Sequence, residues 1–155
     1  MKKLLFIGTL LLVIAACSGT SKEDAPLGAL VNRGDEKIQM YYVVLEAEDG
    51  DKTKKRVEFY IDLKIINELK LNEAQIRNIC SESILYADWT VKFKPTYKHS
   101  ESASLRYDEA EKKITVLMDG TAENAYGVPD DIMSIISFDI KGKMILNKDG
   151  VPDIY

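Results

Sequence analysis

Hydrophobic residues between positions 40 and 65 follow the two-residue period of β-strands. Met40 to Leu45 is an unbroken run of apolar and aromatic residues, and every second residue from Val57 to Ile65 is apolar. Both segments predict strands, because side chains on a strand point alternately to opposite faces. The segment Asp49-Gly50-Asp51-Lys52 between them has the composition of a turn, so we expect the two strands to pair antiparallel.

After Leu71 the hydrophobic period changes to that of an α-helix. Asn72 is followed three residues later by Gln75, which is a capping-box pattern, and Glu73 suits the positive end of the helix dipole. Apolar residues then recur at helical spacing, at Ile76, Ile79, Cys80, Ile84 and Ala87. We therefore predict a helix with one buried face, on which Cys80 is a buried and unreactive thiol.

From Trp89 onward the period returns to two. Trp89, Val91, Phe93 and Tyr97 alternate with polar residues, which predicts a strand with one exposed face. Further strands are predicted over 103–107, 113–122, 132–140 and 143–146, with short polar connections at 108–112 and 141–142. The expected fold class is α+β, with one main helix packed on an antiparallel β-meander.

The first sixteen residues have the three zones of a bacterial export signal. Lys2 and Lys3 supply positive charge, positions 4–14 are mainly apolar, and Ala15-Ala16 precede Cys17. The apolar run is shorter than the ~20 residues that a membrane-spanning helix needs. We therefore expect residues 1–16 to be a cleaved signal peptide.

Ile14-Ala15-Ala16-Cys17 resembles the lipobox of bacterial lipoproteins, and the chain is similar to small envelope lipoproteins of Gram-negative bacteria. The resemblance implies that the Cys17 thiol carries diacylglycerol, that the chain is cut before Cys17, and that a fatty acid such as palmitate acylates the new amine. Three acyl chains would make membrane attachment effectively permanent. An ordinary secretory signal that leaves Cys17 free is the alternative.

The residues after Cys17 predict a tether followed by one domain. Residues 17–35 are rich in small and polar residues, which is typical of a flexible linker, and 36–155 is the length of a single α+β domain. Lys22-Glu23-Asp24 looks like the surface-export signal of some Gram-negative lipoproteins. This resemblance implies a lipid-anchored protein of the cell outer membrane exposed at the surface, with the periplasmic leaflet as the alternative.

The charge of the chain argues against nucleic acid as a partner. Removal of residues 1–16 takes away two lysines and no acids, so the formal net charge changes from −4 to −6. The basic run at 52–56 lies beside Asp49 and Asp51, which favours a solvated turn over a binding patch. With Cys17 lipidated, Cys80 is the remaining cysteine, so we expect no internal disulfide.

No segment has the pattern of a catalytic, cofactor-binding or metal site, so we expect a protein that is not an enzyme. His99 is the sole histidine, which argues against a zinc site built from several histidines. Its neighbours Ser100, Glu101 and Ser102 are adjacent in sequence and would not converge as a catalytic triad, so we predict a polar loop between strands. The pair Asp130-Asp131 is predicted to lie in a surface turn.

Asn124 to Pro129 is the most distinctive interior segment. Gly127 permits a positive φ and Pro129 fixes its own φ, which predicts a structured bend between strands. The Asn-x-aromatic-Gly pattern is similar to one in small uncharacterised bacterial domains built as a helix followed by strands, which implies the fold and no activity. Asn124, Tyr126 and Gly127 are the candidate binding residues, and a purely structural turn is the alternative.

The C-terminal segment at 147–153 resembles half of the Asp-rich calcium repeats of some exported proteins. It offers three side-chain oxygen donors, whereas calcium takes six to eight oxygen ligands, so we predict a terminal turn.

These observations together favour a lipid-anchored cell-envelope protein that acts as a non-enzymatic binding or accessory module. We expect it to contact the membrane through its lipid and an envelope protein or glycan through its sheet or its bends. Two alternatives stay open: an inhibitor or immunity lipoprotein that blocks an exported hydrolase or toxin, and an envelope hydrolase.

Overall fold

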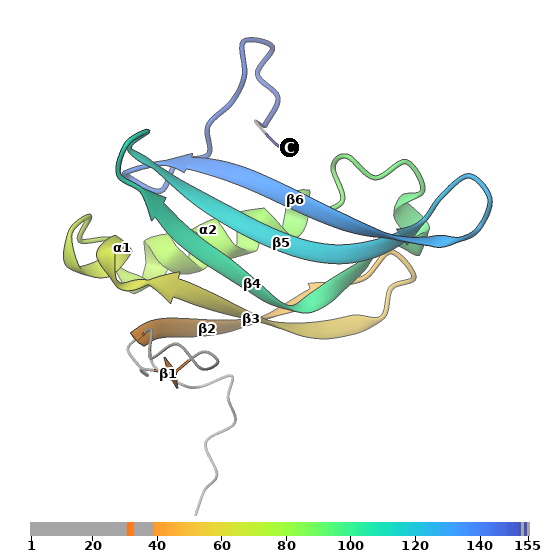
Figure 1. The fold of residues 1–155 in the computed structure, drawn as a ribbon, viewed down its shortest axis with the longest axis horizontal. Helices are drawn as coiled ribbons and strands as arrows, with labels where there is room; N and C mark the ends of the chain where they lie inside the picture. Colours follow the sequence, from red (N-terminus) through yellow and green to blue (C-terminus); the bar gives the residue numbers. More distant parts are fainter. Residues whose placement is uncertain (1–30, 33–38, 153, 155) are drawn as a thin grey trace, which may run out of the picture.

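The computed structural model describes residues 31–32, 39–152 and 154, and in this part of the chain a six-stranded sheet curves around a helix (Figure 1). The strands are β1 (Val31–Asn32), β2 (Gln39–Glu48), β3 (Lys54–Asp62), β4 (Lys98–Asp108), β5 (Lys113–Glu123) and β6 (Pro129–Asp139). The helices are α1 (Leu63–Asn67) and α2 (Glu73–Tyr86), with a 3₁₀ turn η2 (Lys94–Thr96) before β4. The fold class is therefore mixed α+β, as predicted.

The strands lie side by side in the order in which they occur in the sequence. β1 to β3 pair antiparallel, and so do β4 to β6, but β3 and β4 run parallel, from Glu58 opposite Ser102 to Ile61 opposite Leu105. The prediction of an antiparallel meander throughout is wrong at this junction. The segment with α1 and α2 carries the chain back to the end where β3 began, so the next strand must run in the same direction as β3.

The hydrophobic core lies between α2 and the face of the sheet that it covers (Figure 1). Alternate residues of β3, β4, β5 and β6 point into it, as the two-residue period requires. The largest fully buried side chains include Phe59, Ile61, Leu105, Ile114, Met118, Ile136 and Phe138 from the sheet and Ile76 and Ile79 from α2.

Helix α2 begins as predicted, at a capping box. The side chain of Asn72 accepts a hydrogen bond from the Gln75 amide at 2.9 Å, and the Gln75 side chain accepts one from the Asn72 amide at 3.0 Å. The predicted buried face is also present, with Cys80 fully buried on it. Ser83 joins that face because its hydroxyl donates to the Ile79 carbonyl at 2.7 Å, which satisfies a polar group inside the core.

The strand predicted to reach Ile65 ends earlier, at Asp62. The Asp62 carboxylate accepts a hydrogen bond from the Lys64 amide and caps α1, so Leu63 and Ile65 are helical. Ile65 is still buried. Its spacing of four residues from Ile61 fits one helical turn as well as a strand, so the hydrophobic pattern alone predicts a longer strand.

The strand predicted from Trp89 to Tyr97 is also wrong, because residues 87–97 form turns and η2, and β4 begins only at Lys98. The amides of Trp89 and Val91 donate back to the carbonyls of Tyr86 and Asp88, which continues the chain reversal after α2. Pro95 lies within η2 and has no amide hydrogen to give to a sheet. The segment predicted as a strand over 143–146 makes single bridges only, from Met144 to Phe138 and from Leu146 to Pro152.

Candidate functional site

The predicted bend at 124–129 is the tip of the β5–β6 hairpin. The Asn124 amide donates to the Val128 carbonyl at 2.9 Å, and the Gly127 amide donates to the Asn124 carbonyl at 3.0 Å. Gly127 has a φ of 72°, the left-handed backbone that glycine adopts without strain. The Asn124 side chain accepts from the amides of Tyr126 and Val128 and donates to the Asp130 carboxylate. These bonds fix the backbone around Tyr126.

Tyr126 is the most exposed large hydrophobic residue among those that the structure describes. Its side chain is 90% exposed and that of Val128 is 53% exposed. The tip lies at the opposite end of the sheet from α1 (Figure 1). Asn124, Tyr126 and Gly127, which the sequence singled out, are therefore brought together in one turn, in which Asn124 and Gly127 set the backbone and Tyr126 presents its ring.

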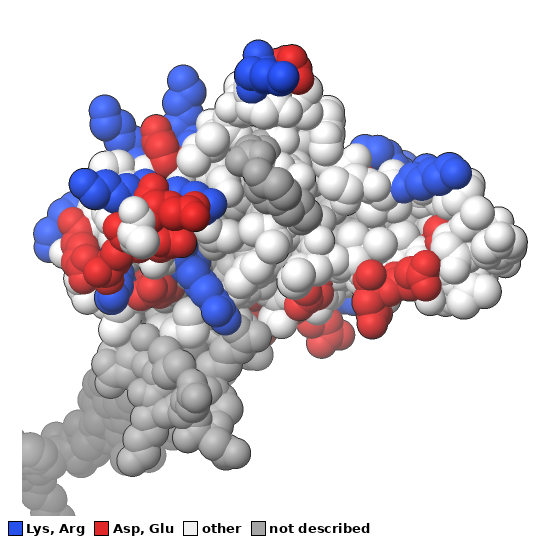
Figure 2. Space-filling view, turned by 45° about the horizontal axis from the view of Figure 1, so that its top comes forward, with Lys and Arg blue, Asp and Glu red and all other residues white. Residues whose placement is uncertain are grey.

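Acidic residues surround the base of this tip. The stretch from position 119 to 133 contains Asp119, Glu123, Asp130 and Asp131 and no lysine or arginine, and all four acids are exposed. Asp130 and Asp131, predicted to lie in a turn, are at the start of β6, opposite Ala122 and Thr121. Figure 2 shows acidic side chains gathered along one side of this end of the molecule. We call residues 119–133 the acidic arm.

The same turn geometry occurs twice more, after Asp139 and after Asn147. In each turn the amide of the first residue donates to the carbonyl four residues on, and a glycine three residues on donates back. Each first residue also accepts two backbone hydrogen bonds with its side chain. Residues 147–151 of the segment that resembles a calcium repeat therefore form the predicted turn, in which the Asn147 side-chain oxygen accepts the backbone amides of Asp149 and Val151. Among the described residues no group of three or more metal-ligating side chains is placed to hold a metal ion.

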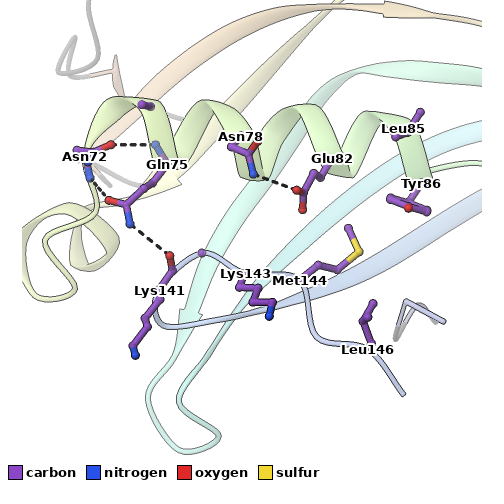
Figure 3. A pocket seen from close by; sticks show the side chains of 12 residues that line it. Asn72, Gln75, Asn78, Glu82, Leu85, Tyr86, Lys141, Lys143, Met144 and Leu146 are labelled. Atoms are coloured by element: carbon purple, nitrogen blue, oxygen red, sulfur yellow. Dashed lines mark hydrogen bonds between the residues drawn. The ribbon is translucent and has the colours of Figure 1, made fainter. Parts of the chain in front are cut away.

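A groove of about 750 Å³ separates α2 from the chain that follows β6 (Figure 3). Asn72, Gln75, Asn78, Glu82, Leu85 and Tyr86 line it from the helix, and Lys141, Gly142, Lys143, Met144 and Leu146 line it from the opposite side. The side-chain Nε2 of Gln75 donates to the Lys141 carbonyl at 3.3 Å, which joins the two sides at one end. At the other end Leu85 and Leu146 are 68% and 51% exposed.

The prediction that His99 lies in a polar loop is wrong. His99 belongs to β4, and only 4% of it is exposed. Its backbone amide and its ring Nδ1 lie 2.9 Å and 3.0 Å from Asp49 Oδ1, and Asp49 is equally buried. Ser100 and Glu101 follow it in the same strand. The histidine thus pairs with a carboxylate from a distant turn, not with its sequence neighbours. The pair lies in the interior, where it joins the β2–β3 turn to β4.

Asp49 belongs to a turn with the same backbone bonds as the three turns above. The Asp49 amide donates to the Thr53 carbonyl, and the Lys52 amide donates to the Asp49 carbonyl. Lys52 has a φ of 70°. The difference is the Asp49 side chain, which faces inward to His99, while Asp51 accepts from the Thr53 amide. Sequence reasoning missed this pair because the two residues are fifty positions apart.

The thiol of Cys80 is enclosed on the buried face of α2, and burial raises its pKa well above the ordinary value of a thiol. The protonated form is the unreactive one, which agrees with the prediction of a structural cysteine. Cys17 lies outside the described residues, as does the predicted tether apart from Val31 and Asn32, which form β1 and pair with Met40 and Gln39 of β2.

Within residues 31–32 and 39–152, no helix is long and apolar enough to cross a membrane. Comparison with protein-family models, with curated proteins and with solved structures found no match for this chain.

Proposed function

We propose that this chain is a lipid-anchored protein of the cell outer membrane that acts as a non-enzymatic binding module and uses the acidic arm to contact an envelope partner. The lipobox-like sequence that ends at Cys17 supports the anchor. The observation that carries the binding role is the nearly complete exposure of Tyr126 on a turn whose backbone is already fixed by hydrogen bonds.

A fixed turn favours binding because a loop that is already ordered loses little conformational entropy when a partner closes on it. Tyrosine is among the residues that contribute most to protein interfaces, since a large ring is desolvated at the cost of only two side-chain torsions. The four carboxylates behind Tyr126 repel an acidic surface and attract a basic one. The partner expected here is a protein with an apolar pocket and a positively charged rim.

A non-enzymatic role agrees with the position of His99. A general base must reach a substrate proton, and this imidazole is enclosed in the core with its Nδ1 on Asp49. The pair has the contacts of a structural hydrogen bond, so the hydrolase alternative gains no support from it.

Site-specific photocrosslinking in living cells tests the proposal. A benzophenone amino acid in place of Tyr126 should give one dominant adduct with an envelope protein. The same probe in place of Trp89 is the control, because Trp89 is also exposed but lies in the turn that follows α2. The proposal fails if position 126 gives no adduct, or gives only the adducts that position 89 gives.

A second function, inhibition of a secreted hydrolase or toxin, is favoured by the same arm. A two-stranded arm with an apolar tip and negative charge behind it has the form of a plug for a cationic cleft. Deletion of the gene should then sensitise cells to a competitor, and a Tyr126→Ala copy should fail to restore resistance where the wild type restores it. Unchanged survival of the deletion strain across a broad panel of competitors would exclude this role.

A further inference from the structure

The loop between α2 and β4, residues 87–97, exposes two aromatic rings that belong neither to the core nor to the acidic arm. Trp89 is 45% exposed and Phe93 is 38% exposed. Figure 1 shows this segment as the green loop that stands out from the body of the fold. We infer that the loop is a membrane-contact site, at which both rings enter the headgroup layer of a bilayer that contains anionic lipids. The inference goes beyond the protein partner proposed for the acidic arm.

Each exposed ring has a lysine ammonium group beside it. Lys94 Nζ lies 5.5 Å from the centroid of the Trp89 ring. Lys92 Nζ lies 5.7 Å from the centroid of the Phe93 ring. This combination suits the boundary between water and lipid, because aromatic rings lie in the headgroup layer, while a lysine packs its stem on apolar surface and holds its ammonium group at the phosphates.

The charge of the loop favours anionic lipid. Asp88 is the one acidic residue between positions 83 and 97, and its carboxylate lies 3.3 Å from Lys94 Nζ. Lys92 has no carboxylate partner among the residues that the structure describes. Two lysines and one aspartate give the loop a formal charge of +1 in a chain whose net charge is −4. Anionic headgroups therefore attract this loop.

The acidic arm adjoins the loop and restricts how the molecule meets a bilayer. The Glu123 amide donates to Thr96 Oγ1 at 2.9 Å, so the base of the arm is next to η2. Figure 2 shows the acidic side chains of this end gathered on its lower side and basic side chains on its upper side. The loop therefore meets anionic headgroups with the carboxylates of the arm turned toward water.

The backbone of the loop suits a lipid surface because its amides are bonded locally. The Trp89 amide donates to the Tyr86 carbonyl at 2.9 Å. The Val91 amide donates to the Asp88 carbonyl at 3.0 Å. A backbone donor without a partner is costly in lipid, and these bonds remove that cost. They also fix the turns that carry the rings, so little conformational entropy is lost on contact.

The two rings are too small a surface to hold a protein by themselves. Together they expose on the order of 200 Å², given aromatic side-chain areas of about 150–250 Å². A stable protein interface covers about 800 Å² on each partner. A bilayer needs less contact, because an anchor keeps it at a high effective concentration. This step rests on the proposed function, which assigns a lipid anchor to Cys17.

The loop can reach the bilayer that holds the anchor. Val31, in β1, follows Cys17 by 14 positions, and an extended chain of this length spans at most about 50 Å. Val31 pairs with Met40 near the start of β2, whereas a Cβ added to Gly50, just after β2, would lie 2.0 Å from the Lys94 carbonyl oxygen. The ten residues of β2 span about 33 Å. The distance along β2 is therefore shorter than the reach of the chain.

Fluorescence of Trp89 on vesicles tests the inference, because the chain has a single tryptophan. Residues 17–155 contain every helix and strand that the structure describes, so this chain is used. Since Cys80 is buried, a maleimide lipid couples to Cys17 and anchors the chain whether or not cells acylate it. The vesicles contain equal parts of phosphatidylcholine and phosphatidylglycerol, with bromine on the acyl chains close to the glycerol. Bromine quenches only a tryptophan that enters the bilayer.

We expect brominated lipid to lower the Trp89 emission at least about twofold, and Lys92→Glu/Lys94→Glu to lose more than about half of this quenching. Arg106→Glu/Lys148→Glu makes the same change of charge at exposed positions outside the loop and should be quenched like the wild type. Urea denaturation should show that both variants are folded.

The inference is overturned if Trp89 of the anchored chain is not quenched, which would leave the rings to a protein partner. It is also overturned if Lys92→Glu/Lys94→Glu is quenched like the wild type, or if vesicles of phosphatidylcholine alone quench as strongly. Because the anchor is made chemically, these results do not depend on acylation of Cys17 in cells. Failure of the proposed anchor and failure of the contact site are therefore separate outcomes.

Discussion

Asp49 in the turn after β2 and His99 at the start of β4 meet inside the protein, where one carboxylate oxygen accepts both the backbone amide and the ring N–H of the histidine at 2.9 and 3.0 Å. The Gly50 amide adds a bond to the Tyr97 carbonyl at 2.8 Å, and Lys55 Nζ donates to the His99 carbonyl at 2.7 Å. The β2–β3 turn is therefore fixed to the strand that follows the helices.

Asp49→Ala should lower the free energy of unfolding by about 2–3 kcal/mol, because it leaves two buried donors of His99 without an acceptor. Urea denaturation followed by circular dichroism measures this loss. Asp51→Ala, in the same turn but exposed, should lower the free energy of unfolding much less than Asp49→Ala does. Equal losses for the two variants would mean that the buried pair does not stabilise the fold.

Tyr97→Phe should raise the free energy of unfolding at pH 7 by about 1 kcal/mol, because the buried Tyr97 hydroxyl has no hydrogen-bond partner among the described residues. Burial also raises the pKa of this phenol above its ordinary value, and the nearby Asp88 charge raises it further.

The raised pKa of Tyr97 predicts a dependence on pH. The folded state holds the phenolic proton more tightly than the unfolded state, in which the phenol ionises near pH 10. Ionisation of Tyr97 therefore leaves the free energy of unfolding unchanged below about pH 10 and lowers it as the pH rises above that value. Urea denaturation at pH 7 and pH 10.5 should therefore show a smaller decrease for Tyr97→Phe than for the wild type. A parallel decrease in both proteins would contradict this assignment.

Gly50→Ala should destabilise the protein by about 2–3 kcal/mol, since a Cβ at this position would lie 2.0 Å from the Lys94 carbonyl oxygen and 2.6 Å from the Pro95 carbonyl carbon. At Gly127 no atom lies within 4 Å of an added Cβ. Gly127→Ala should therefore lose only about 1 kcal/mol, because alanine disfavours the left-handed backbone conformation at this position. Thermal denaturation of both variants compares the two effects. A larger loss at Gly127 than at Gly50 would contradict the close approach at Gly50.

Cys17→Ala should move the protein from the membrane fraction to the soluble fraction and abolish labelling by a fatty-acid analogue, because the thiol proposed to carry the lipid is lost. Its unfolding midpoint in urea should not change, since Cys17 lies in the predicted tether and outside every periodic segment. Wild type that takes up no label, or a variant that stays tightly bound to membranes, would contradict the proposed anchor.

Features that depend on neighbouring residues could be predicted from the sequence. Asn72 and Gln75 form the predicted capping box, and Gly127 has the predicted positive φ, because each requires only a few adjacent positions. Pattern alone failed where two structures share one spacing, as at Ile65, which belongs to α1 and not to a longer strand.

Features that join distant parts of the chain could not be predicted. The parallel pairing of β3 and β4 depends on where the helices return the chain. The sequence of neither strand indicates whether its neighbour runs parallel or antiparallel. The candidate groove had no local signal either, because its two sides come from α2 and from the segment after β6. The tip at Asn124 to Gly127 could be predicted from the sequence, because the residues that form the turn and the exposed Tyr126 ring are neighbours in the chain.

The parallel pairing of β3 with β4 also bears on the order in which the parts of the protein fold. Glu58 and Ser102 face each other although 44 positions separate them, whereas β2–β3, β4–β5 and β5–β6 are each joined by a short turn. Closing a long loop costs more entropy and proceeds more slowly than closing a hairpin. The hairpins should therefore form first as two separate units, and the docking of the crossover with α2 should be the slow step that completes the sheet.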